Sequence, residues 1–101
     1  MGEAMAKRYE LHFQEGFDHD RVEIHIGDKM VEQDSLTTRM QIGLAKIAEI
    51  EAGPGKVLKV KFPELGEEVS VKLQKSQSYV CINKKENRLA IEWADVSPGY
   101  L

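Results

Sequence analysis

The chain has 101 residues, of which 42% are hydrophobic and 31% are charged, and its formal net charge is −3. This composition is typical of one small globular domain, and it excludes wholesale disorder, a fibrous repeat and a second domain with its own core. No apolar run approaches the roughly 18 residues of a membrane-spanning helix. We therefore expect no membrane partner, and a mildly acidic chain with few aromatic residues is also a poor candidate for binding nucleic acid.

Residues 1–6 lack the apolar core of a secretory signal, and we interpret them as an N-terminal tail or a remnant of cloning. Residues 7–101 are predicted to form a single domain. The expected location is the cytoplasm by default, or an extracellular or periplasmic space if a signal peptide was removed. The lone Cys81 excludes an internal disulfide bond and favours a reducing compartment.

The first predicted hairpin joins an extended segment at 7–14 to a second one at 21–26. When His12 is placed opposite His25, Leu11, Phe13, Ile24 and Ile26 fall on one face. The opposite face then carries Glu10, His12, Gln14, Glu23 and His25.

Residues 27–52 are harder to interpret. Short strands are predicted at 29–32 and 35–39, on either side of turn-forming residues. Residues 40–52 alternate in a way that suits a strand covered on both faces, but their spacing also fits a helix, so a helix near residues 38–52 is the alternative. The strand is favoured because short strands separated by turn signals occupy the rest of the chain.

Two further hairpins are predicted in the second half of the chain. The first sets the segment 57–62 against the segment 69–74, with Phe62 opposite Val69 and Val60 opposite Val71. The next sets Ile82 against Leu89 and Val80 against Ile91. In both hairpins the apolar side chains share one face.

Seven or eight short strands with this rhythm predict an all-β fold, a small antiparallel sandwich in a single domain. The arrangement resembles immunoglobulin-like and transthyretin-like sandwiches in architecture and strand spacing. The alternative is an α+β fold with one helix near residues 38–52. The chain lacks the cysteine and tryptophan spacing of a true immunoglobulin domain, so the resemblance implies a scaffold and no specific function.

A metal site is one candidate. Cross-strand neighbours have Cβ atoms about 4.5–5.5 Å apart, so His12 and His25 could share a zinc, copper or nickel ion with Glu10 or Glu23 from the same face. The solvated face of a sheet is the competing interpretation, and it is favoured because no ligand-spacing motif is present. No cofactor is therefore predicted.

Other chemistry finds less support. Glu15, Asp18 and Asp20 could offer oxygens to calcium, but too few ligands are present in a recognisable spacing. Cys81 has no neighbouring group that would activate it, and we interpret it as a packed structural residue. No phosphate-binding loop or nucleophile elbow is present, so no catalytic residue is predicted and an enzyme is not expected.

The preferred function is a non-catalytic binding or assembly module that acts through protein–protein contacts, including self-association. An edge strand or a charged sheet face would make the contact, and the predicted outward side chains of the middle hairpin are Lys59, Lys61 and Lys72. The alternatives are the metal-binding protein and a carbohydrate-binding domain. The latter would use Phe17 and Tyr79 as exposed rings, although Phe17 is expected to tuck back under the first hairpin.

Overall fold

The computed structural model describes residues 6–100 and shows that this part of the chain contains eight strands and no helix. The strands are β1 (Lys7–Phe13), β2 (Asp20–Ile26), β3 (Lys29–Leu36), β4 (Lys46–Ala52), β5 (Val57–Phe62), β6 (Glu67–Lys72), β7 (Tyr79–Lys85) and β8 (Arg88–Ala94). The predicted all-β fold is confirmed. Of the proposed N-terminal tail, only Ala6 lies within the described residues.

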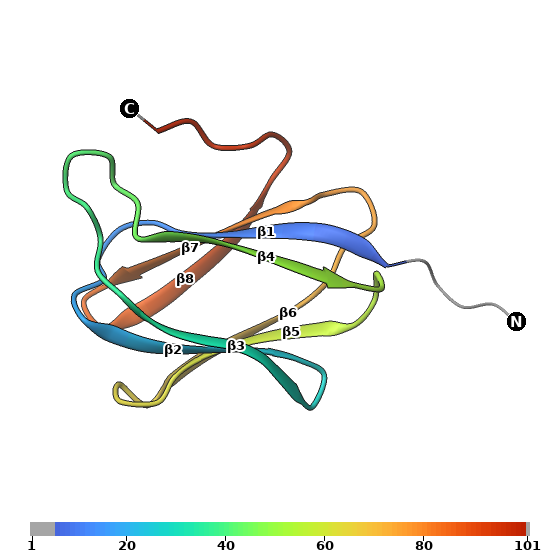
Figure 1. Ribbon diagram of the computed structural model, residues 1–101, viewed down its shortest axis with the longest axis horizontal. Coiled ribbons are helices and arrows are strands. Elements are labelled where there is room, and N and C mark those ends of the chain that lie inside the picture. Colours follow the sequence, from blue (N-terminus) through green and yellow to red (C-terminus); the bar gives the residue numbers. More distant parts are fainter. Residues whose placement is uncertain (1–5, 101) are drawn as a thin grey trace, which may run out of the picture.

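The strands form two four-stranded sheets that pack face to face as a sandwich (Figure 1). One sheet has the order β4-β1-β7-β8 and the other has the order β3-β2-β5-β6. All pairings are antiparallel except that of β1 with β7, which is parallel. Parallel neighbours need a long connection. Here the connection from β1 to β7 includes all four strands of the second sheet.

The core lies between the sheets and is built from alternate residues of each strand, as a period of two requires. Tyr9, Leu11 and Phe13 of β1 are fully buried, and so are Val60 and Phe62 of β5 in the opposite sheet. Aromatic rings from the two sheets are in contact in this core. Phe13 meets Phe62 edge to face, with ring centroids 6.5 Å apart.

The first predicted hairpin is wrong, because its two strands belong to different sheets. β1 pairs with β4 and β7, whereas β2 pairs with β3 and β5. Phe13 and Ile24 are both buried in the core, but they enter it from opposite sheets. The alternation of apolar residues shows which face of a strand is buried, and it is equally satisfied by a neighbour in the same sheet or by a strand in the facing sheet.

The two later hairpins exist, but their registers differ from the predicted ones by two residues. Val60 lies opposite Val69, and Ile82 lies opposite Ile91. A shift of two residues leaves every side chain on its predicted face, so burial alone cannot select between the two registers. The turns select it: β7 and β8 are joined by Glu86 and Asn87 alone, both with positive φ, as in the tight turns that suit a two-residue hairpin.

The ambiguous segment is a turn followed by a strand, and the helix near residues 38–52 is wrong. Arg39 and Leu44 form an isolated antiparallel bridge that closes a turn, and β4 follows it. Ala48, Ile50 and Ala52 of β4 are buried, while the residues between them are exposed or half-buried. Pairing with β1 lets β4 bury its alternate apolar side chains in the core. This burial outweighs the helical spacing of the segment.

Candidate functional site

The predicted histidine pair does not exist. His12 lies opposite Ile47 on one side and Cys81 on the other, in the sheet β4-β1-β7-β8. His25 lies in the other sheet, opposite Met30 and Lys59. Each histidine points away from the core, so the two rings are on opposite outer faces of the sandwich.

Each histidine is instead bound to the glutamate two residues before it, as the alternation of side chains predicts. The Glu10 carboxylate lies 2.9 Å from Nε2 of His12, and the Glu23 carboxylate lies 3.1 Å from Nε2 of His25. These four residues therefore cannot surround a single ion. Across residues 6–100, no group of three or more His, Cys, Asp or Glu side chains is arranged to hold a metal.

His12 is only 1% exposed, because the C-terminal segment covers it. The Tyr100 ring stacks on the imidazole at 5.7 Å, and its hydroxyl lies 2.8 Å from Nδ1. The Gln14 amide donates to the same hydroxyl at 3.0 Å, and Tyr79 meets the imidazole edge to face. Because the Glu10 carboxylate accepts from Nε2, Nδ1 is free to accept from Tyr100 when the imidazole is neutral. Burial raises the pKa of the Tyr100 phenol above its ordinary value.

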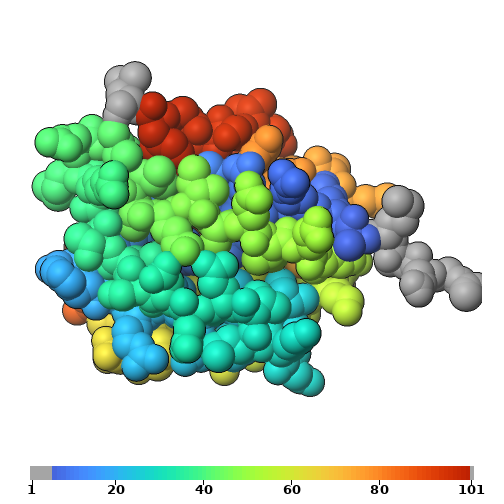
Figure 2. Space-filling model, viewed as in Figure 1, coloured from blue at the N-terminus to red at the C-terminus, as the bar shows by residue number. Residues whose placement is uncertain are grey.

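The C-terminal segment therefore lies over His12 on the outer face of the sheet β4-β1-β7-β8, and Figure 2 shows it in red along the top of the molecule. Cys81 lies on the same covered face. It is 8% exposed, and burial, followed by the nearby Glu92 carboxylate, raises the pKa of its thiol. Cys81 is packed, as expected, and its raised pKa leaves less of the reactive thiolate.

The outer face of the sheet β3-β2-β5-β6 carries the predicted lysines. Lys59 and Lys61 are half-buried on the central strand β5, and Lys72 is exposed on the edge strand β6. Glu23 and Glu68 both lie directly opposite Lys61, and Glu68 also approaches Lys59 at 3.9 Å. We call this surface the lysine face. It comprises Arg21, Glu23, His25, Met30, Gln33, Ser35, Val57, Lys59, Lys61, Glu68, Ser70 and Lys72.

The lysine face also carries apolar side chains. Met30 is 45% exposed and Val57 is 42% exposed, at the end of the face near the turn between β2 and β3. In Figure 1 no described segment of chain passes over this face, whereas the C-terminal segment lies over part of the outer face of the other sheet. The lysine face is thus open to a partner, and it has more basic than acidic side chains.

The aromatic pair proposed for carbohydrate binding is not assembled. Phe17 is 3% exposed and stacks on Phe62 with ring centroids 5.5 Å apart. It tucks back into the core, as expected, so it is wrong as an exposed binding ring. Tyr79 is half-buried beside His12 on the covered face. The two rings belong to different environments and form no common platform.

The structure also contains a hollow that the sequence did not reveal. It lies at one end of the sandwich, between the β1–β2 loop and the β3–β4 connection, and its volume is about 640 Å³. We call it the loop-end hollow. Its lining consists of Glu15, Gly16, Phe17, Asp18, Thr37, Thr38, Met40, Gln41, Ile42 and Gly43. In the sequence, only Gly16 and Gly43 next to turn residues point to this region. They do not show that the two loops meet.

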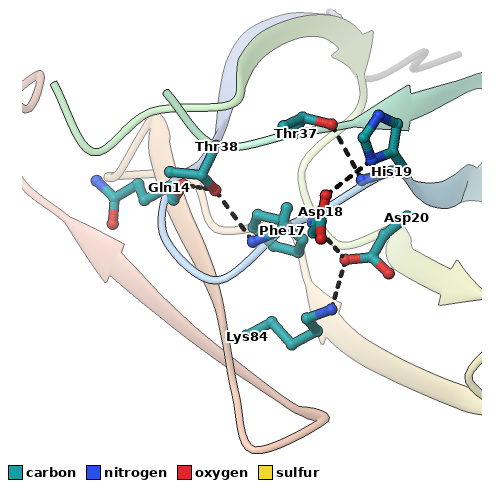
Figure 3. Close-up of polar contacts among 8 residues, drawn as sticks. All are labelled: Gln14, Phe17, Asp18, His19, Asp20, Thr37, Thr38 and Lys84. Atoms are coloured by element: carbon teal, nitrogen blue, oxygen red, sulfur yellow. Dashed lines mark hydrogen bonds and ion pairs between the residues drawn. The ribbon is translucent and has the colours of Figure 1, made fainter. Parts of the chain in front are cut away.

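The threonines tie the two loops together (Figure 3). The Thr38 hydroxyl accepts from the Phe17 backbone N–H at 3.0 Å and donates to the Gln14 carbonyl at 2.7 Å. The Thr37 hydroxyl accepts from the His19 N–H at 3.0 Å. These contacts hold the wall of the hollow in one shape.

The same loop does not form the calcium site that its acidic residues suggested. The Asp20 carboxylate is bound to the Lys84 ammonium and accepts from the Asp18 backbone N–H at 3.0 Å (Figure 3). Both members of the ion pair are close to nine-tenths buried. Asp20 is therefore engaged in holding the loop against β7 and does not join Asp18 and Glu15 around an ion.

The chain matches no protein-family model, no curated protein and no solved structure, so no relative supplies a function for it. Within residues 6–100, no helix is long and apolar enough to cross a membrane.

Proposed function

We propose that the protein is a non-catalytic binding module that docks an acidic protein surface on its lysine face. The observation that carries this proposal is the contrast between the two outer faces. The C-terminal segment covers the middle of one face, over His12, whereas no described segment crosses the lysine face, which combines basic side chains with the exposed Met30 and Val57. Apolar side chains beside an excess of basic over acidic groups are suited to a protein interface, where the charges direct the encounter and the apolar groups supply affinity.

The edges of the same sheet offer a second means of contact. β6, which carries Lys72, and β3 are the two edge strands, and each has a row of backbone groups without a neighbouring strand. A partner, or a second copy of the chain, can add a strand at such an edge. Charged residues along both strands also limit uncontrolled pairing, so a specific partner is favoured over aggregation.

A non-catalytic role is proposed because the groups best suited to chemistry have other roles. Burial raises the pKa of the Cys81 thiol, and the His12 ring is held between Glu10 and Tyr100. We also propose that the likeness to immunoglobulin-like and transthyretin-like sandwiches concerns only the two-layer architecture. A cytoplasmic location is proposed from the single cysteine of the sequence.

An NMR titration with an acidic peptide of alternating Glu and Leu residues tests the lysine face. We expect the amide signals of β2, β5 and β6 to shift and the effect to weaken at high salt. The double substitution Lys59→Glu with Lys61→Glu should abolish the shifts. A matched control is Lys75→Glu with Lys85→Glu, which changes the net charge equally at exposed positions away from this face.

Unchanged binding by the double variant, or equal loss in the control, would refute the proposed surface. Sedimentation at low and high salt, carried out on the same variants, tests self-association. A dimer that is lost only in the Lys59 and Lys61 variant would identify a second copy as the partner. A wild-type protein that stays monomeric at high concentration would remove self-association.

A further inference from the structure

The loop-end hollow has the features of a preformed side-chain pocket. Its two walls come from loops that are far apart in sequence, and the Thr37 and Thr38 hydroxyls join them. The loop carrying Gly16 is also pressed against β7. Gly16 has φ +94°, and a Cβ at this position would lie 1.8 Å from the Lys84 carbonyl oxygen. The shape of the hollow is therefore imposed by the fold, and a ligand entering it would need to order little of the chain.

The charge of the lining is all of one sign. Glu15 and Asp18 are the only ionisable residues among the lining side chains, and both are acidic. Asp18 is paired with the exposed His19 imidazole at 2.7 Å. The ion pairs found within residues 6–100 do not include Glu15. One carboxylate at the hollow is therefore available to a cation.

The position of that carboxylate adds a geometric constraint. The Glu15 Oε2 atom lies 3.3 Å from the place that a Cβ on Gly43 would occupy. It thus reaches across from the β1–β2 loop to the β3–β4 connection, where the half-buried Ile42 and the 92% exposed Met40 also line the hollow. A carboxylate oxygen and two apolar side chains are therefore side by side at the hollow.

We propose that the loop-end hollow binds a lysine or arginine side chain of a partner polypeptide. The cationic head would meet the Glu15 carboxylate, and the alkyl stem would lie against Met40 and Ile42. Long basic side chains bind in this way because their stems are apolar while their heads remain charged. Methionine suits such a wall because its side chain adapts to the shape of what it contacts.

Other ligand classes fit the lining less well. A phosphate or carboxylate ligand would find no basic side chain there. Calcium requires six to eight oxygens, and the Asp20 carboxylate that could add to Glu15 and Asp18 is bound to Lys84. This inference is independent of the proposed function, because it concerns a different surface of opposite charge.

An NMR titration with a short acetylated peptide amide containing one lysine tests the proposal, with the same peptide containing norleucine as the probe lacking the charge. We expect the lysine peptide to shift the amide signals of Gly16, Met40 and Gly43, and the norleucine peptide to bind more weakly. Glu15→Gln should weaken the lysine peptide by about tenfold, because a charge-assisted hydrogen bond is lost. Unchanged Gly16 and Gly43 signals in the peptide-free variant would show that the loops are intact.

The matched control is Glu51→Gln, which removes the same charge from an exposed position on β4. It should leave binding unchanged. Equal binding of both peptides, or equal effects of the two substitutions, would overturn the proposal. Failure of the lysine peptide to bind would likewise overturn it.

Discussion

The hydroxyl of Tyr100 is expected to hold the C-terminal segment on its sheet. In Tyr100→Phe the ring can still stack on His12, but Nδ1 of His12 and the Gln14 amide both lose a hydrogen-bond partner. His12 is 1% exposed, so water cannot easily replace the hydroxyl while the segment stays in place. Leaving a buried polar group without a partner costs about 1–3 kcal/mol.

Two features place the expected loss in the lower part of that range. Tyr100 is half-buried, which allows some access of water, and the Gln14 amide nitrogen also contacts the Cys81 sulfur at 3.6 Å. We therefore expect Tyr100→Phe to lower the free energy of unfolding by about 1–2 kcal/mol. For a domain of this size each kcal/mol corresponds to a fall of roughly 4–8 °C in Tm.

Urea and thermal unfolding followed by circular dichroism would measure the loss. Tyr79→Phe is a matched control, because the Tyr79 ring meets the same imidazole in a T-shaped arrangement and its hydroxyl makes no hydrogen bond within the described chain. We expect the control to change stability by less than about 0.5 kcal/mol. Equal losses in the two variants, or no loss in Tyr100→Phe, would refute the role assigned to the Tyr100 hydroxyl.

Three further outcomes follow from the local geometry. Gly16→Ala should lower the free energy of unfolding by at least about 2 kcal/mol, more than Gly27→Ala, because both positions have positive φ but only the first meets a backbone carbonyl; equal denaturation midpoints would contradict this. The Lys46 ammonium, 2.6 Å from Asp34, lowers the pKa of this exposed carboxylate, so Asp34→Asn should cost under about 1 kcal/mol at neutral pH. Because the folded-state pKa is lowered, the stabilisation by Asp34 is lost as the pH falls through that pKa. The free energies of unfolding of wild type and Asp34→Asn should therefore converge at acid pH, and a difference that persists there would contradict this prediction. The Cys81 thiol, with its pKa raised by burial, should react with iodoacetamide much more slowly in native protein than in urea, and equal rates would show that it is accessible.

The lysine face was predictable because it depends only on which residues of a strand share a side. Lys59 and Lys61 alternate with Leu58 and Val60, both fully buried, and this alternation survives the two-residue error in register. The loop-end hollow was not predictable in this way. It exists only because the chain crosses between sheets after β1, which brings Phe17 to within hydrogen-bond distance of Thr38.

The sequence by itself determined that the chain forms strands, and which face of most strands is buried, because side chains in an extended chain alternate between two sides. Only the tertiary structure decided which strands are neighbours. A strand moved to the facing sheet, or shifted by two residues along its partner, still buries the same side chains. Packing of whole sheets selects among these arrangements, and His12 therefore lies beneath Tyr100 instead of beside His25.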